Sequence, residues 1–330
     1  MRGRGGQPGR SLHVDGGVGD LSSARYHRAI AQVSEGRMQE ERSVSIVARI
    51  ALAFACGPVR IGKRTIVLLA LLTYHGTLTA KADSCPSATD EISTDRPDVT
   101  NSSLVVPAGS LQIENGVNLS TRDGGRFVDG TNTRLRAGIA NCLEVLVDVP
   151  TYFANLRGGG GSGFSDVAPA LKWQISPIPG KVDLSAVFGV ALPTGSAGIA
   201  GRGAQPYLQF PWSWELRGGW GLSGMLTEFI RPSDRTRLIT EATFVIEKKV
   251  TERASLFVEY VGDYPENGSP SQLVNSGGVY RLTPTQQVDF HVAVGLNHNA
   301  PSYIVGVGYS VRFDDLFLVR RGSASIAPRN

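Results

Sequence analysis

The sequence predicts an all-β fold, a transmembrane antiparallel β-barrel of about 12 strands of the outer-membrane type. Residues 303–313 alternate between large apolar and small or polar side chains, over the ~9–11 residues that a tilted strand needs to cross a bilayer. Twelve such segments follow residue 109, and single-chain bacterial barrels have an even number of strands. Long and short connections alternate between them, as expected of outside loops and periplasmic turns.

The composition agrees with a β-rich membrane protein. The chain has 330 residues, of which 41% are hydrophobic and 19% charged, and it contains 40 glycines. The body of the chain has no long apolar run, which excludes a helical membrane protein. The formal net charge of +4 comes largely from arginines near the N-terminus, and no basic stripe with interleaved aromatics occurs, so we expect no nucleic-acid partner.

The first 58 residues are rich in Gly, Arg and Ser and show no sustained periodicity. We interpret 1–58 as disordered or as lying outside the working protein, with translation starting at Val59. Such a segment cannot bury enough apolar surface to fold by itself.

Residues 59–82 have the pattern of a secretory signal peptide. Basic residues up to Arg64 precede the apolar run 66–72, and Ala80-Lys81-Ala82 is a small-x-small cleavage site. The apolar run is too short to span a bilayer, although an N-terminal membrane anchor remains the alternative. The signal predicts export to the outer membrane of a Gram-negative bacterium.

The exported part divides into three segments. We expect 83–109 to be a polar periplasmic lead-in, 110–313 to be the barrel and 314–330 to be a C-terminal tail. The expected partners are outer-membrane lipids, a small-molecule solute, and the barrel-assembly machinery, which would engage the closing strand from Tyr303 to Phe313.

Each predicted strand places apolar side chains on one face and polar ones on the other. In 182–192, for example, Leu184 and Phe188 alternate with Asp183 and Ser185. The predicted strands are 110–120, 133–141, 143–153, 165–175, 182–192, 205–216, 218–229, 237–248, 253–262, 273–283, 286–297 and 303–313.

A soluble β-sandwich is the alternative fold, because its strands also alternate. Three features favour the barrel: strands of mostly 10–12 residues, their even number, and the alternating loop lengths. The predicted outside loops include 121–132, 154–164, 193–204 and 263–272, whereas the turns at 141–142 and 284–285 are short.

Short motifs along the mature chain carry a family resemblance. They are Thr94-Asp95-Arg96-Pro97-Asp98, 106–109 with 111–116, 163–167 with Leu171-Lys172-Trp173, 192–196, Val258-Glu259-Tyr260, 286–289, Gly295-Leu296-Asn297, Ala300-Pro301 and 308–313. In these motifs, 92–313 resembles the outer-membrane transporter-like family described as "putative MetA-pathway of phenol degradation". Ser302 and Val288 depart from it, since the family usually has Asp and Leu there. The resemblance implies a barrel that moves small, often aromatic, compounds.

Nearly all strand charges fall on the predicted inward face, since a lipid-facing Arg or Lys at the bilayer midplane costs ~2–4 kcal/mol. They predict a polar, water-filled lumen; the alternative is a closed lumen whose charges pair with one another. Among the charged residues ten are acidic and five basic, so ion selectivity should favour cations. With one histidine, the candidate lumen residues are Glu114, Arg134, Arg136, Glu144, Asp148, Asp166, Lys172, Asp183, Glu215, Glu241, Glu247, Glu259, Arg281, Asp289, His291 and Arg312.

Asp289, His291 and Ser310 could form an orienter, base and nucleophile, because they lie on the inward faces of two neighbouring predicted strands. An ordinary polar lumen is the preferred interpretation of such a trio in a barrel wall, and inward-pointing groups would not meet acyl chains. We therefore assign no catalytic residues. No group of His, Cys and Asp has metal-ligand spacing, and we expect no metal and no cofactor.

The chain contains three cysteines, and Cys56 precedes the signal peptide. Cys85 and Cys142 are both expected on the periplasmic side, where oxidation is favoured. We predict a disulfide between them that pins the lead-in to the barrel rim; the alternative is two free thiols.

The predicted function is an outer-membrane channel for passive uptake of small molecules, aromatic or hydrophobic ones among them, and not an enzyme. Two alternatives remain open. One is a barrel enzyme of the esterase or lipase kind, and the other is a structural or adhesive barrel with a closed lumen. A barrel fold by itself does not choose between them.

Overall fold

The computed structural model describes residues 91–122, 125–157, 161–178, 182–232 and 236–317, which belong to one compact unit. The predicted extension 1–58, the signal peptide 59–82 and most of the tail 314–330 lie outside these residues. No helix in the described part of the chain is long and apolar enough to span a membrane.

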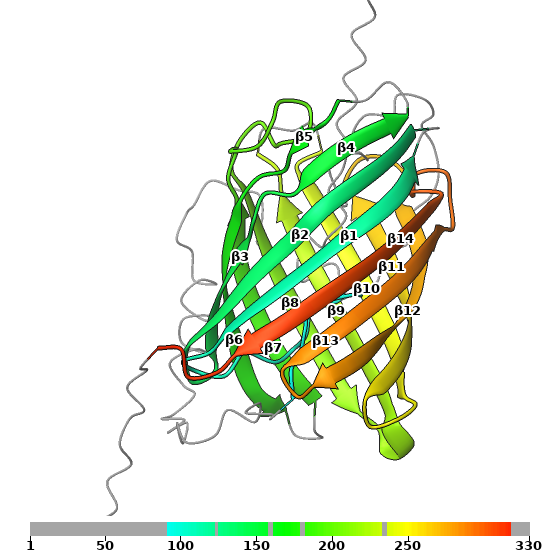
Figure 1. The fold of residues 1–330 in the computed structure, drawn as a ribbon. Helices are drawn as coiled ribbons and strands as arrows, with labels where there is room; N and C mark the ends of the chain where they lie inside the picture. The colour runs from blue at the N-terminus through cyan, green and yellow to red at the C-terminus, as the bar shows by residue number, and fades with distance from the viewer. Residues whose placement is uncertain (1–90, 123–124, 158–160, 179–181, 233–235, 318–330) are drawn as a thin grey trace, which may run out of the picture. The chain divides into compact units, whose positions relative to one another are not determined.

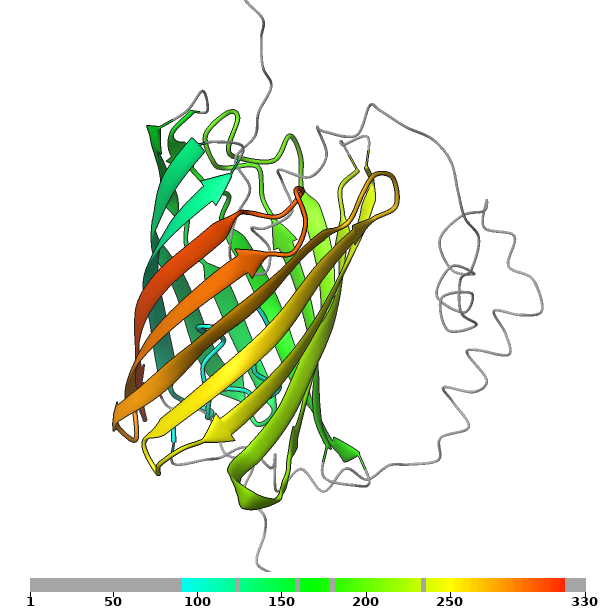
Figure 2. The same ribbon diagram turned by 90° about the vertical axis from the view of Figure 1, so that its right-hand side faces the viewer.

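The chain forms a closed antiparallel β-barrel (Figures 1 and 2). Sequential strands pair with one another, and the first pairs with the last. The segments are β1 (Leu111–Arg122), β2 (Gly125–Ala140), β3 (Leu143–Asp148), β4 (Tyr152–Arg157), β5 (Gly163–Phe164), β6 (Ala168–Ile178), β7 (Val182–Ala191), β8 (Gln205–Glu215), β9 (Trp220–Ile230), β10 (Leu238–Lys249), β11 (Ala254–Pro265), β12 (Ser271–Thr283), β13 (Gln286–Gly295) and β14 (Tyr303–Phe313).

The 14 segments make twelve barrel strands, which confirms the predicted fold class. Both β3 and β4 pair with β2, so together they form one interrupted strand. In the same way β5 pairs with β4 and β6 with β3. The first interruption contains Pro150, which has no N–H to donate to a neighbouring strand.

The barrel closes between its two ends in sequence. β1 pairs with β14 in unbroken register from Leu111↔Phe313 to Thr121↔Tyr303. The closure removes both sheet edges, which a bilayer requires because it offers no water to unpaired backbone groups.

The two faces of the wall have inverted polarity. Leu256 and Val258 on the outer face are 52% and 55% exposed, whereas Glu259, the next residue on the inner face, is fully buried. A water-soluble protein would not expose this many large apolar side chains in a continuous belt. The pattern therefore places lipid outside the barrel and polar groups inside it.

Two predicted loops are wrong in part. The predicted loop 154–164 contains the end of β4 and all of β5, and the second case is larger. The sequence was interpreted as a loop over 121–132, but β1 continues to Arg122 and β2 begins at Gly125. Phe127 and Asp129 face inward and are buried, whereas Arg126, the residue before Phe127, is exposed. Polar composition suggested a loop here, whereas the period-2 alternation decided the structure.

The predicted lead-in 83–109 also differs from the structure. Residues 91–109 do not lie beneath the barrel but run inside its lumen, as the cyan segment in Figure 2 shows. We call residues 91–109 the plug. Its polar groups need partners when they leave water, and the inward-facing side chains supply them.

Candidate functional site: the plugged lumen

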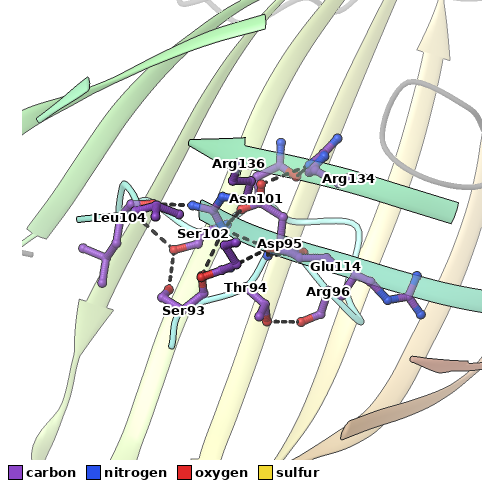
Figure 3. A network of polar contacts seen from close by, with 12 residues as sticks. Ser93, Thr94, Asp95, Arg96, Asn101, Ser102, Leu104, Glu114, Arg134 and Arg136 are labelled. Atoms are coloured by element: carbon purple, nitrogen blue, oxygen red, sulfur yellow. Dashed lines mark hydrogen bonds and ion pairs between the residues drawn. The ribbon is translucent and has the colours of Figure 1, made fainter. Parts of the chain in front are cut away.

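Asp95 of the plug lies among three cationic side chains of the barrel wall, two of which, Arg134 and Arg136, are labelled in Figure 3. Its carboxylate is 3.1 Å from Nη1 of Arg134, 3.2 Å from Nη1 of Arg136 and 3.5 Å from Nζ of Lys172. Burial by itself raises the pKa of Asp95, but the three cations outweigh burial and hold this pKa well below its usual range. Asp95 is therefore ionised across the physiological pH range.

Wall carboxylates hold the same three cations from the other side. Nε of Arg134 is 2.7 Å from Oδ1 of Asp148. Nη2 of Arg136 is 2.9 Å from Oε1 of Glu144, and Nη1 of Arg136 is 3.1 Å from Oε1 of Glu114. We call Asp95, Glu114, Arg134, Arg136, Glu144, Asp148 and Lys172 the ionic cluster. Buried charges of this kind are tolerated because each has several partners.

The plug pairs with the strands only at one β-bridge among the described residues, between Ala108 and Gly138 of β2. Its ends also donate backbone hydrogen bonds to carbonyl oxygens, from Ile92 to Pro284 and from Gly109 to Gly138. Between these ends, backbone amides of the plug donate to side-chain acceptors of the wall. The N–H of Asp95 donates to both carboxylate oxygens of Glu114 at 3.2 and 3.0 Å, and the N–H of Val106 donates to Oε2 of Glu144 at 2.6 Å. Gln174 accepts a 3.0 Å bond from the N–H of Val105. Side chains of the wall thus satisfy buried backbone donors of the plug.

On the opposite wall, the carboxylate of Glu259 binds neutral donors of the plug. Glu259 accepts hydrogen bonds from the N–H groups of Val99 and Thr100 at 3.0 and 2.9 Å, and from Oγ1 of Thr100 at 2.8 Å. Oγ1 of Thr100 also lies 2.5 Å from Oγ1 of Thr243. On β7 to β11 every candidate lumen charge is a carboxylate, so this wall is acidic.

Asp98 of the plug faces the acidic wall. Burial and the neighbouring carboxylate of Glu259 raise the pKa of Asp98 well above its usual range. The pKa shift is opposite to that of Asp95, because the neighbouring charge at Asp98 is a carboxylate and not a cation. The plug therefore meets compensating charge on one side of the lumen and like charge on the other.

Arg96 fixes the plug to the closing seam of the barrel. Its Nη2 lies 3.3 Å from Oδ1 of Asp289 on β13. The guanidinium lies over Gly116 of β1 and Gly308 of β14, which pair directly with each other. A Cβ at either glycine would overlap the Arg96 side chain, so both positions require glycine for this close approach.

The three residues considered as a catalytic set are not brought together. His291 bonds through Nδ1 to Asn275 and through Nε2 to Asn118, both at 3.1 Å. Asp289 pairs with Arg96 instead, and Oγ of Ser310 has no hydrogen-bond partner among the described residues. The arrangement supplies no nucleophile bonded to a base.

The remaining candidate lumen residues occupy three kinds of position. Buried Asp166 accepts hydrogen bonds from the N–H groups of Gly195 and Gly201 at 3.0 and 2.9 Å, so it organises an outside loop. Glu241 is fully buried in the acidic wall. Near the periplasmic ends, Asp183 and Glu247 are half-buried, Arg281 pairs with Glu91, Arg312 pairs with Asp314, and Glu215 lies 3.7 Å from Lys249 in solvent.

Cys142 is disulfide-bonded. It lies between β2 and β3, at the end of the barrel where β1 begins. Its predicted partner, Cys85, lies outside the described residues.

No group of three or more His, Cys, Asp or Glu side chains in the described ranges could hold a metal ion.

The plug residues that make the site were not predicted as site residues. Asp95 and Arg96 belong to the motif 94–98, which was expected in a periplasmic lead-in outside the barrel. One sequence signal pointed inward: Gly116, Gly306 and Gly308 share the inner face of two neighbouring strands. Inner-face positions without side chains leave room that another segment of the chain can fill.

Taken together, the fold and the site define an outer-membrane type of β-barrel whose lumen holds an N-terminal plug. The family model described as "Putative MetA-pathway of phenol degradation" matches residues 94–313. The chain belongs to this family, and the match begins within the plug and ends at the last residue of β14.

Solved structures with similar folds are outer-membrane proteins of low sequence identity. An outer membrane channel from Pseudomonas putida F1 shares 12% identity, with a TM-score of 0.49 over 63% of this chain and 97% of that one. The KdgM porin shares 9% identity, with a TM-score of 0.44 over 61% and 99%. The CymD monoaromatic hydrocarbon channel shares 12% identity, with a TM-score of 0.39 over 64% and 90%. No curated protein matches the chain at a significant level.

Proposed function

We propose that the protein is a channel for passive uptake of small molecules across the outer membrane, and that the plug sets when solutes pass. The observation that carries this proposal is the way the plug is held. Between its two ends, where backbone bonds join Ile92 and Gly109 to the wall, it crosses the lumen without strand pairing and docks through ion pairs and side-chain hydrogen bonds. Such contacts can be exchanged for water when the plug shifts.

Apolar side chains inside the wall support small aromatic or hydrophobic solutes as the cargo. Leu146, Val187, Tyr207, Phe229 and Ile239 form one buried cluster with alanines of β6. They face the lumen, because each lies an even number of positions along its strand from inward-facing residues, as Leu146 does from Glu144 and Ile239 from Glu241. The rings of Tyr207 and Phe229 are 6.0 Å apart. The phenol-degradation description of the family agrees with an aromatic cargo.

Planar-bilayer recordings test the channel. We expect protein purified from outer membranes to give small, cation-favouring currents, and the Asp95→Asn variant to give larger ones. Uptake of phenol into vesicles should exceed that of a sugar of equal size. Absence of solute flux through both proteins, shown to be inserted, would reject the channel.

We also propose that the protein is not an enzyme. Its one inward histidine is bonded to two asparagines rather than to a nucleophile. An esterase assay on wild type and His291→Ala checks this. Hydrolysis that disappears in the variant would favour the barrel enzyme instead.

Export by the segment 59–82 completes the proposal. The basic, apolar and small-residue regions of that segment support cleavage after Ala82. N-terminal sequencing of protein from outer membranes should find Asp83 first. A mature chain that retains any part of 66–72 would favour a membrane anchor.

A further inference from the structure

Two arginines face each other on the outer surface of the barrel near the hairpin of β1 and β2. Arg126 of β2 is opposite Arg157 of β4 at a register shift, since the next pair is Phe127 with Asn155, so that Leu156 and Arg157 together oppose Arg126. The two strands lie side by side in Figure 1. Both side chains are exposed, and within the described residues neither has a hydrogen-bond or ion-pair partner. We call Arg126 and Arg157 the rim pair.

Like charges directly opposite each other on one face of a sheet are destabilising. Nothing in the described fold offsets the repulsion in the rim pair, because the nearest strand neighbours are Thr121, Leu156 and Gly125. The cost is removed when an anion binds between the two guanidinium groups. A phosphate suits this geometry, since each arginine presents a planar fork of donors to its oxygens.

The height of the rim pair on the wall identifies the source of the phosphate. Tyr152 and Phe164 lie on the same outer face, 43% and 50% exposed, with ring centroids 5.0 Å apart in an edge-to-face pair. Aromatic side chains of this kind mark the membrane interface of a barrel. Tyr152 is opposite Gly130, four positions from Arg126. At ~3.3 Å per residue and a tilt of ~40°, the rim pair lies roughly 10 Å further out.

Leu156 next to the rim pair is 57% exposed. An apolar side chain at this position can contact the upper part of an acyl chain while the arginines reach the head group. The outer leaflet of a Gram-negative outer membrane consists of a phosphorylated glycolipid, lipid A with its sugars. A lipid with acyl chains below and phosphate above matches this order of side chains.

We propose that the rim pair is a binding site for the phosphate of an outer-leaflet glycolipid. This inference depends on the location of the barrel in the outer membrane and not on the proposed transport function. Lipid bound here would fasten the long β1–β2 hairpin to the leaflet beside it.

Binding of purified lipid A to the full chain in detergent micelles tests the proposal. Native mass spectrometry would compare phosphorylated lipid A with its dephosphorylated form. We expect wild type to prefer the phosphorylated form by tenfold or more. The double variant Arg126→Gln/Arg157→Gln should lose that preference, and Arg126→Lys/Arg157→Lys should keep part of it because charge remains without the fork.

The matched control is Arg237→Gln, an exposed arginine just before β10 whose N–H lies 3.2 Å from Oε1 of Glu266. It should leave lipid A binding unchanged. Heat-modifiable migration in gels shows that each variant is folded. Equal binding by wild type and the double glutamine variant would overturn the proposal, as would equal binding of both lipid A forms to wild type. Displacement of lipid A by millimolar inorganic phosphate would show a site for free phosphate and would overturn the lipid assignment.

Discussion

The plug contacts two walls of the lumen that differ in charge. On β2, β3 and β6, the carboxylate of Asp95 meets Arg134, Arg136 and Lys172 within 3.5 Å. On β10 and β11, Asp98 faces the carboxylate of Glu259, and Glu259 itself is bonded by amides and neutral side chains. Asp95 and Asp98 are only three residues apart, yet their pKa values shift in opposite directions.

The difference teaches that the plug is held by ion pairs at the wall that carries the ionic cluster, whereas neutral donors hold its middle, Val99 and Thr100, at the acidic wall. Removing a partner from a buried ion cluster leaves uncompensated charge, which is costly. Removing a carboxylate that faces another carboxylate relieves repulsion instead. Unequal anchoring predicts that the contacts at the acidic wall are lost before those of the ionic cluster.

The largest effect should come from Asp95→Asn. The change leaves three buried cations short of an acceptor, so we expect the free energy of unfolding to fall by about 3–5 kcal/mol. Urea denaturation in detergent micelles would measure the loss, and open-channel current should rise as the plug undocks. The matched control is Asp98→Asn, an isosteric change on the same plug. If both variants lose stability equally, the two walls are not different.

A second, smaller effect concerns the seam. Gly308→Ala places a Cβ where Arg96 passes, and overpacking of this kind costs about 1–3 kcal/mol. We expect Arg96 to be displaced from Asp289 and the current to increase, while barrel assembly persists. The double variant Gly308→Ala/Arg96→Ala should recover stability, because the overlap is gone. No recovery would show that Gly308 matters for the strand and not for the plug.

The strength of the contacts between the plug and the acidic wall is tested by Thr100→Val. The variant keeps the side-chain volume and removes the hydroxyl that bridges Glu259 and Thr243. A lost hydrogen bond to a charged acceptor costs about 1.5–3 kcal/mol, so the loss should be smaller than for Asp95→Asn. Thr131→Val, on the outer part of β2, serves as a threonine control. A Thr100→Val loss as large as that of Asp95→Asn would contradict the unequal anchoring.

The smallest effect is a pH dependence at Asp98. Its pKa is raised when the plug is docked, so its contribution to docking is fully present below the pKa of the free group, ~3.9. That contribution is lost as the pH rises through the docked pKa. Channel current should therefore increase modestly with pH in wild type and not in Asp98→Asn.

Asp95, in the ionic cluster, predicts a pH dependence of docking with the opposite sign. Its pKa is depressed by docking, so its contribution is present above the free pKa and is lost only as the pH falls towards the docked value. Between pH 4 and pH 8 its anchoring should not change. Current that rises on mild acidification, and that disappears in Asp95→Asn, would reverse the assignment of the two walls.

Much of the barrel could be predicted from the sequence, because a strand in a bilayer has little freedom. Alternation in a segment such as 182–192 determines which face meets lipid. A shift of the strand register by one residue would point the side chain of Asp183 into the membrane. The prediction failed where alternation was interrupted or obscured. Pro150 divides one predicted strand into β3 and β4, and the polar 121–132 forms strand rather than loop.

The candidate site was predicted only in part. Inward-facing charged residues such as Arg136 and Glu144 were predicted from the alternation along their strands. Their partners in the plug were not predicted, since the plug has no periodicity of its own. Asp95 and Arg96 belong to an irregular segment whose position depends on acceptors from strands far away in sequence, as in the bond from Arg96 to Asp289, 193 residues away.

The sequence by itself determined the closed barrel, its strand order and the chemistry of its two faces, because each follows from local alternation under the constraint of lipid. Only the tertiary structure decided that residues 91–109 fill the lumen and that one wall fixes them while the other repels Asp98. Those outcomes depend on which buried charges come within a few ångströms of each other, and alternation along a strand carries no information about the distances across a barrel.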